Sequence, residues 1–234
     1  MFNTDKKYFI NKLFKNTDFI NKTLSRTEKT ELKKLIKQGI LKYQIYGEQI
    51  PSLINEKYNY QVIMFFEIEI ANIKKSYLIN ELLQKTVPAP CIFKFTDNKN
   101  ICYGFADKRL SQTNNNEIVV DENYVSNIFT TNTTQNKYLN YLNIKNKTNK
   151  RCFYTELLIK TFVADNMKLI SNLNLVFDSK LWYSEEQKLK FYFKLKELKK
   201  LSDLIITVNT AKEKVAINNK IKDLITELKT FYAD

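Results

Sequence analysis

The stretch QVIMFFEIEIA, residues 61–71, decides the fold of this chain together with the segments SYLINELLQKT, VPAPCIFKF and ICYGFADKRL that follow it up to Leu110. Alternate residues of the first segment share a face, as in a β-strand: one set is Val62, Met64, Phe66, Ile68 and Ile70, and the other is Ile63, Phe65, Glu67 and Glu69. Both faces are apolar at the start, so we expect a central strand. Ser76 to Thr86 has helical spacing, with Leu78, Leu82 and Ile79 inward, and predicts a helix covering one face of the sheet.

Neighbouring segments extend this α+β pattern, a small mixed or antiparallel sheet covered by helices. Residues 91–95 and 101–105 predict a hairpin closed by the turn residues DNKN. Upstream, Ser25 and Glu28 have the spacing of a capping box, which predicts a helix that Gly39 ends. ILKYQIY, residues 40–46, alternates with period two and predicts a strand.

The pattern weakens after Leu110. SQTNNNE (111–117) and TTNTTQNK (130–137) are polar and turn-prone, and we expect loops there, with a short strand at IVV between them. CFYTELLIKTFVADNMKLI (152–170) predicts a helix. For SNLNLVFDSKLWY (171–183) we expect a turn with an extended piece.

The last fifty residues predict an antiparallel helical hairpin, broken at ITVNT (206–210). The first helix has an apolar stripe of Phe191, Leu195, Leu198 and Ile205, and the second has Ile217, Ile221, Leu224, Leu228 and Phe231 at steps of four and three. That spacing is typical of a coiled-coil seam, but an ordinary pair of core helices fits nearly as well. We expect an α+β body at 1–183 and the hairpin at 184–234, with Ile217, Ile221, Leu224 and Leu228 as the partner-binding residues.

Two segments also carry a family resemblance. The first segment is LKKLIKQGILKYQIYGEQI (32–50) with the segments that follow it up to Leu110. The second comprises the charged helices from Glu185 to Leu228, which contain Lys214, Val215 and Asn218. Both resemble the bacterial family catalogued as domain of unknown function 4391 (DUF4391). Residues 111–184 match poorly. The resemblance implies an α+β body with a helical tail, in genes found near restriction-modification or helicase-like components, and it implies no catalytic residues.

The formal charge of +13 suggests a polyanionic partner such as nucleic acid. Of 38 basic residues only three are arginine, beside abundant Asn, Ile, Tyr and Phe, so an AT-rich genome accounts for part of this charge. Residues 1–50 nevertheless hold eleven basic against five acidic side chains. Lysines such as Lys29, Lys33, Lys34 and Lys37 can hold phosphates without reading sequence. Nucleic-acid contact and a merely solvated basic surface both stay open.

Composition excludes several classes of enzyme. The chain has no histidine, which removes His-based triads and most metalloprotease sites, and its three glycines cannot build a phosphate-binding loop of the P-loop or dinucleotide type. The three cysteines form no CxxC pair, so we expect buried free thiols. No apolar run approaches the roughly 20 residues of a membrane span and no signal peptide is evident, so we expect a cytoplasmic protein.

One catalytic hypothesis survives. Glu67 and Glu69 project from the same strand face and could hold Mg²⁺ in a nuclease, with Asp97 or Asp107 as further ligands and Lys94 or Lys108 as charge stabilisers. Restriction-type nucleases usually place a lysine two residues after the second acid, where this chain has Ala71. We favour the alternative that the two glutamates lie at the polar end of one sheet face and pair with Lys94 across strands.

Two function classes follow. The first is a non-enzymatic accessory or adaptor, without a cofactor, that binds protein through its hairpin and nucleic acid through its lysine-rich N-terminal region. The second is the Mg²⁺-dependent nuclease.

Overall fold

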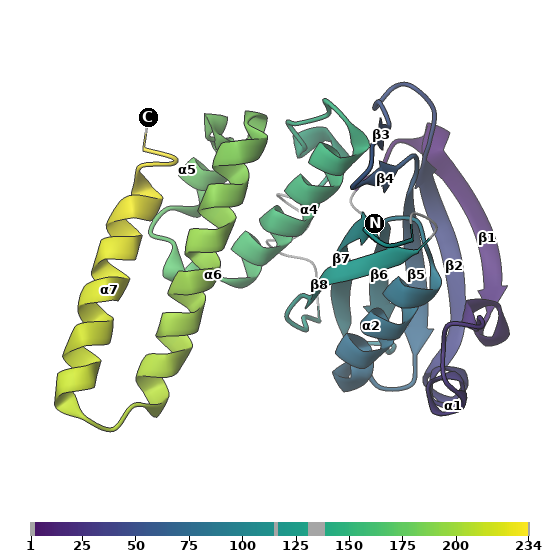
Figure 1. Cartoon of the computed structure of the whole chain (residues 1–234), viewed down its shortest axis with the longest axis horizontal. Helices are drawn as coiled ribbons and strands as arrows, with labels where there is room; N and C mark the ends of the chain where they lie inside the picture. The colour runs from purple at the N-terminus through teal and green to yellow at the C-terminus, as the bar shows by residue number, and fades with distance from the viewer. Residues whose placement is uncertain (1–2, 115–116, 131–138, 234) are drawn as a thin grey trace. The chain divides into compact units, whose positions relative to one another are not determined.

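The computed structural model describes residues 3–114, 117–130 and 139–233 (Figure 1). The chain packs as two units, Met1–Thr155 and Glu156–Asp234, and helix α4 (Lys150–Asp165) begins in the first and ends in the second. The expected boundary between body and hairpin at residues 183/184 stays a prediction.

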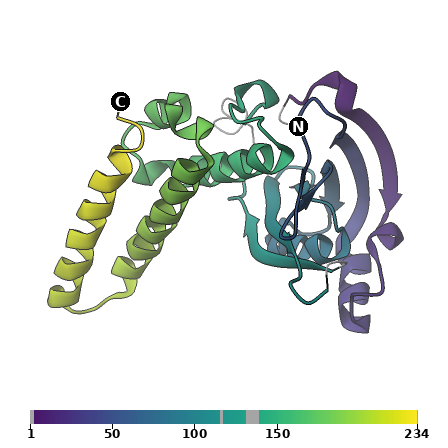
Figure 2. The same cartoon turned by 45° about the horizontal axis from the view of Figure 1, so that its top comes forward.

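The first unit is built on a sheet, seen from a second side in Figure 2. The sheet has six strands in the order β1-β2-β5-β6-β7-β8. Its strands are β1 (Phe9–Lys15), β2 (Ile36–Ile45), β5 (Ile63–Ile70), β6 (Cys91–Thr96), β7 (Ile101–Leu110) and β8 (Ile118–Val125). Neighbours run antiparallel, except that β5 and β6 are parallel and are joined through α2 (Ser76–Thr86). Strands β3 (Leu53–Ile54) and β4 (Asn59–Tyr60) form a separate pair. The predicted α+β class is confirmed.

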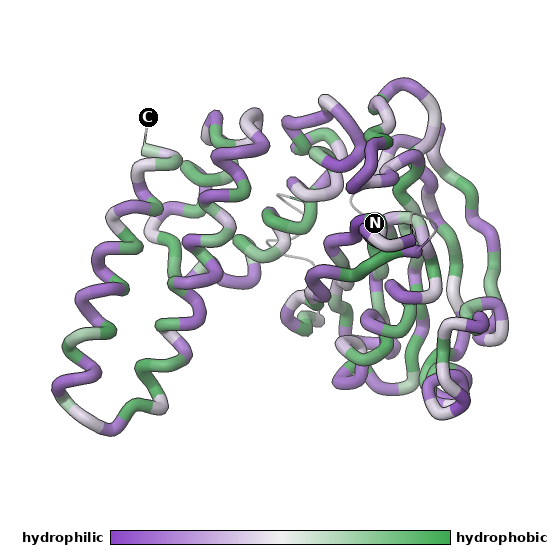
Figure 3. Tube along the Cα trace, viewed as in Figure 1, coloured by the Kyte–Doolittle hydropathy of each residue, from purple (hydrophilic) through white to green (hydrophobic). Residues whose placement is uncertain are grey.

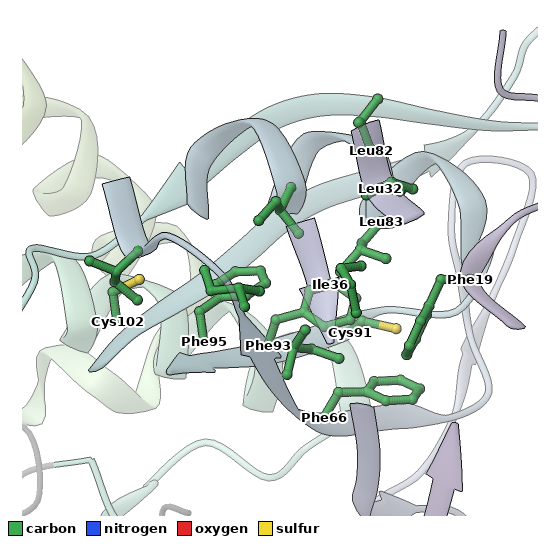
Figure 4. Packing of buried hydrophobic residues seen from close by; sticks show 14 of the residues in the cluster. Phe19, Leu32, Ile36, Phe66, Leu82, Leu83, Cys91, Phe93, Phe95 and Cys102 are labelled. Atoms are coloured by element: carbon green, nitrogen blue, oxygen red, sulfur yellow. The ribbon is translucent and has the colours of Figure 1, made fainter. Parts of the chain in front are cut away.

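Strand β5 lies inside the sheet, as its two apolar faces predict. Phe66 points into a cluster of buried residues that includes side chains of α1 (Arg26–Leu35) and α2 (Figure 4). Ile68 belongs to the same cluster, whereas Phe65 is buried on the opposite face. Helix α2 has the predicted bounds, and Ile79 and Leu82 are buried while Leu78 is only partly so. Leu83, Asn80 and Gln84 are also buried.

The predicted hairpin is present as β6 and β7. In its turn, Asp97 Oδ1 accepts a hydrogen bond from Asn100 N–H. Asn98 adopts a positive φ of 71°, which asparagine tolerates better than most residues. Strand β8 is longer than the predicted IVV. The described residues of 111–117 form a loop, as expected, while most of the 130–137 loop lies outside the described residues.

Helix α1 (Arg26–Leu35) begins at the predicted capping box, in which Ser25 Oγ accepts from Glu28 N–H and Glu28 Oε2 accepts from Ser25 N–H at 2.7 Å. The prediction that Gly39 ends this helix is wrong. The helix ends at Leu35, and Gly39 lies within β2, where a Cβ would come 2.5 Å from the ring of Phe19. Gly39 is therefore required by close packing against Phe19 and not as a cap.

Two further helices of the second unit, α6 (Glu185–Thr207) and α7 (Ala211–Lys229), form the predicted antiparallel hairpin. Phe191 near the start of α6 contacts the rings of Phe231 and Tyr232 beyond the end of α7, and Thr210 caps α7. Apolar and polar residues alternate along both helices (Figure 3).

Residues 171–183 contradict the prediction of a turn with an extended piece. They form α5 (Leu173–Asp178) and a 3₁₀ turn η6 (Lys180–Tyr183), because Asn172 caps the first and the buried Trp182 Nε1–H donates to Val176 O at 2.7 Å. The other 3₁₀ turns are η1 (Lys6–Tyr8), η2 (Asn16–Phe19), η3 (Ile73–Lys75), η4 (Tyr141–Asn143) and η5 (Met167–Leu169).

All three cysteines are buried free thiols, as predicted. Within the described ranges, no helix combines the length and apolar character needed to cross a bilayer.

Candidate functional site

The two strand glutamates each meet cations on one face of the sheet. Glu67 accepts from Lys94 Nζ at 3.0 Å and lies 3.7 Å from Lys42 Nζ. Glu69 accepts from Lys37 Nζ at 3.0 Å and from Gln38 Nε2 at 3.1 Å. The cross-strand contact between Glu67 and Lys94 is the one that the non-catalytic interpretation predicts. A divalent cation at this place would have to displace these ammonium groups.

The two aspartates of the nuclease hypothesis, Asp97 and Asp107, do not join Glu67 and Glu69 in a metal-binding group. Asp97 closes the β6–β7 turn and accepts from Ile73 N–H, Asn100 N–H and the Asn100 side chain. Burial works against its ionisation, but these hydrogen bonds outweigh it and hold the pKa of Asp97 below its usual range. Among the described residues, no group of three His, Cys, Asp or Glu side chains is placed to hold a metal ion.

Asp107 is half-buried on β7. Burial raises the pKa of its carboxyl group, Arg151 opposes that shift, and Asp121 and Glu122 add to it. Its neighbour Lys108 is buried and donates to Val87 O at 2.6 Å and to Ala89 O at 3.0 Å, so it ties down the segment between α2 and β6. Burial lowers the pKa of Lys108 to about 8.

The predicted lysines divide into two kinds. Lys29, Lys33 and Lys34 lie on α1, while Lys37 lies on β2 and pairs with Glu69. With Arg26, the first three define the α1 basic surface (Arg26, Lys29, Lys33 and Lys34). Within the described residues, no carboxylate lies within 4.0 Å of any of these four cationic groups.

Two of the acidic residues close to the α1 basic surface accept backbone hydrogen bonds, whereas Glu31 on α1 is exposed and forms no ion pair with these cations. Glu28 accepts from Ser25 N–H, and Asp18 accepts from Lys15 N–H at 2.7 Å. Asn16 Nδ2 donates to Lys33 O at 3.0 Å and ties the end of β1 to the last turn of α1. The Lys15 ammonium at this junction likewise has no acidic partner in the described part of the chain, so the positive charge continues from α1 onto β1.

The predicted partner-binding residues lie along the hairpin seam. Leu224 and Leu228 are buried, Ile217 and Ile221 are half-buried, and Lys194 on α6 pairs with Glu227 on α7. Three exposed apolar residues, Leu204, Ile206 and Val215, lie near the tip of the hairpin, and Ile206 is 81% exposed, while Phe193 is exposed nearer the start of α6.

Sequence reasoning missed a group of buried polar residues that fix loops and strands. Lys150 Nζ donates to Gly47 O, Ile50 O and Ser52 Oγ at 2.8–3.0 Å. Asn80 Nδ2 donates to Phe105 O at 2.9 Å, and Gln84 Nε2 donates to Cys91 O at 3.1 Å. Asn80 and Gln84 are four residues apart on the inner side of α2, which is a signal that the sequence did carry.

Comparison with known proteins gives one family. The model of the family described as domain of unknown function (DUF4391) matches residues 3–228. No curated protein and no solved structure matches the chain.

Proposed function

The chain belongs to the DUF4391 family, and we propose that it is a non-enzymatic accessory protein of a DNA-processing or restriction system that binds nucleic acid through the phosphate backbone. The α1 basic surface is the contact, and Lys15 extends it. The hairpin of α6 and α7 provides a second contact for a protein partner or another copy of the chain.

The observation that carries this proposal is the absence, in the described ranges, of acidic partners for the four cations of the α1 basic surface. Elsewhere on the sheet, Lys37, Lys42 and Lys94 are all engaged by Glu67 or Glu69. A cation without an internal partner keeps its charge available for phosphate, and release of condensed counterions then favours binding.

The net positive charge is greatest near the N-terminus. Residues 1–155 contain 24 basic and 14 acidic residues, an excess of ten, and residues 1–50 with eleven and five account for six of that excess. Residues 156–234 contain 14 and 11, an excess of three, although their share of basic residues is no lower. The lysine bias of an AT-rich genome would act on the whole chain, so the N-terminal excess supports a role for that surface.

The same surface favours weak sequence selectivity. Three of its four cations are lysines, whose ammonium groups are point charges, whereas base edges are read best by the planar fork of arginine. The ion pairs of Glu67 and Glu69 with lysines favour binding over metal-dependent cleavage, because the carboxylates are already neutralised.

Fluorescence anisotropy with labelled DNA and RNA across a salt series tests the proposal. The α1 variant combines Arg26→Gln, Lys29→Gln, Lys33→Gln and Lys34→Gln; Lys37 is left unchanged because it pairs with Glu69. We expect weaker binding to all sequences. The slope of log affinity against log salt should be smaller by up to about 0.9 for each duplex phosphate that the variant no longer neutralises.

The matched control replaces four exposed lysines of α7, Lys212, Lys214, Lys220 and Lys222, by Gln. It removes a comparable charge from the second unit and should bind nearly as the unchanged protein does. Equally weakened binding in both variants would indicate only a net-charge effect and would contradict a localised interface. Binding that ignores salt, or strong preference for one sequence, would contradict a phosphate-based contact.

A further inference from the structure

The sheet face opposite α2 exposes apolar side chains where β1 and β2 meet. Phe9 pairs in register with Tyr43, and Leu13 with Ile40, on the same face as Phe65 and Glu67. These four residues, Phe9, Leu13, Ile40 and Tyr43, are called the β1–β2 strip. Phe9 is 52% exposed and Leu13 is 60% exposed, although both residues lie on a strand that pairs with β2.

The aromatic ring of Phe9 is held in its orientation by neighbouring aromatic rings. Its centroid lies 5.6 Å from that of Tyr43 in an edge-to-face arrangement, and Tyr43 in turn lies 6.4 Å from the buried Phe65. An exposed ring that neighbouring rings hold in place loses little side-chain entropy when a ligand covers it. The strip therefore offers an ordered π-surface to solvent.

Positive charge borders the strip. Lys15, Lys37, Lys42 and Lys94 reach this face, against the two carboxylates of Glu67 and Glu69. The face thus has a local excess of two positive charges around an apolar centre. A polyanion with flat, apolar faces matches both properties, whereas a neutral apolar partner would match only the strip.

We propose that the β1–β2 strip binds single-stranded nucleic acid, with a base stacked on Phe9 and the backbone of nucleotides further along held by Lys15, at the other end of β1. This inference rests on the proposed nucleic-acid binding and specifies its substrate. In a duplex the base faces are already stacked, but a single strand exposes them, and stacking on aromatic side chains accepts any base. The hydrogen bond from Asn16 Nδ2 to Lys33 O brings the last turn of α1 close to the end of β1. Because α1 packs with α2 on the other face of the sheet, a bound strand reaches the α1 basic surface only by passing around the end of β1.

The test measures anisotropy of labelled oligothymidine, alone and annealed to oligoadenosine, with the full chain. Phe9→Ala should weaken binding of the single strand by about 5- to 150-fold, the range expected when one base no longer stacks on an aromatic ring, and should change duplex binding little. Phe9→Leu keeps an apolar side chain against Tyr43 but removes the ring, so its affinity for the single strand should fall as well. Neither variant should change the salt slope, because both keep every cation that neutralises a phosphate.

The matched control is Phe193→Ala, since Phe193 is 60% exposed on α6 in the second unit. It should bind like the unchanged protein. If Phe9→Ala and Phe9→Leu both bind single strands normally while the α1 variant binds more weakly, the inference is wrong and the proposed function stands. If Phe9→Ala weakens duplex and single strand alike, stacking is also refuted. If the unchanged protein binds neither form at low salt, both proposals are wrong.

Discussion

Gly104 should be among the least replaceable residues of the sheet. A Cβ at this position would lie 2.2 Å from Asn80 Oδ1 and 2.7 Å from Phe95 Cε2. Asn80 cannot withdraw freely, because it is fully buried and its amide donates to Phe105 O at 2.9 Å. Gly104→Ala therefore forces either a backbone shift in β7 or the breaking of this hydrogen bond.

The expected cost follows from these two routes. Overpacking a dense core costs about 1–3 kcal/mol, and leaving a buried polar group unsatisfied likewise costs about 1–3 kcal/mol. Because the variant takes whichever route costs less, we expect Gly104→Ala to lower the free energy of unfolding by about 1–3 kcal/mol. Since domains are stable by about 5–15 kcal/mol in total, this change should be visible in the midpoint of unfolding.

Urea unfolding followed by circular dichroism measures the effect. The control is Gly47→Ala, because Gly47 has a φ of +76° but no atom within 4 Å of an added Cβ, so only backbone strain of about 1–2 kcal/mol applies. Combining Gly104→Ala with Asn80→Ala removes the clashing atom, so the double variant should be more stable than the sum of the single effects predicts. Additive effects, or a destabilisation below about 0.5 kcal/mol for Gly104→Ala, would refute the packing argument.

Three further predictions concern buried charge and the hairpin. Burial lowers the folded-state pKa of Lys108 from 10.5 to about 8, so between these pH values the unfolded chain keeps a proton that the folded chain has released. The free energy of unfolding should therefore rise across that pH window by about 3 kcal/mol relative to Lys108→Met, as measured by urea unfolding at each pH. An equal pH dependence in both proteins would contradict this assignment. Lys150→Met should destabilise the protein by about 2–4 kcal/mol, because it leaves Gly47 O and Ile50 O without the donor, and a thermal midpoint within error of the unchanged protein would rule this out. If the hairpin tip mediates self-association, the unchanged protein should show a concentration-dependent mass in light scattering that Ile206→Ser with Val215→Ser abolishes; a constant monomer mass would exclude it.

The packing of the hairpin determines which substitutions can test its role. Removing residues 185–234 would delete Phe191, which packs on Trp182 within the second unit, so the remaining helices would be left without part of their core. Leu224 and Leu228 are buried, so substituting them would disturb the hairpin itself. Tip substitutions avoid both effects.

Regular patterns in the sequence predicted the central elements well. The alternation from residue 61, the helix of Ser76–Thr86 and the capping box at Ser25 each depend on neighbours close in sequence, and the structure has them where they were expected. Periodicity failed where distant packing decided. Gly39 follows an apolar helical pattern as a helix stop would, yet its role is set by Phe19, twenty residues upstream.

The candidate site was partly predictable for the same reason. Lysine clustering on α1 is a local property, but whether each ammonium has a partner depends on strands far away in sequence, and only the structure separates Lys37 from Lys33 and Lys34. The exposed ring of Phe9 gave no signal, because phenylalanine in a strand ordinarily points into a core. For residues 171–183, the cap at Asn172 was a usable sign of a helix that the expectation of an extended piece overlooked.

The most direct test of the nucleic-acid interface is lysine footprinting by acetylation and mass spectrometry, with and without excess oligothymidine at low salt. We predict that Lys15, Lys29, Lys33 and Lys34 become protected while the exposed Lys212 and Lys214 of α7 react at an unchanged rate. Uniform protection of all exposed lysines, or protection confined to α7, would contradict it.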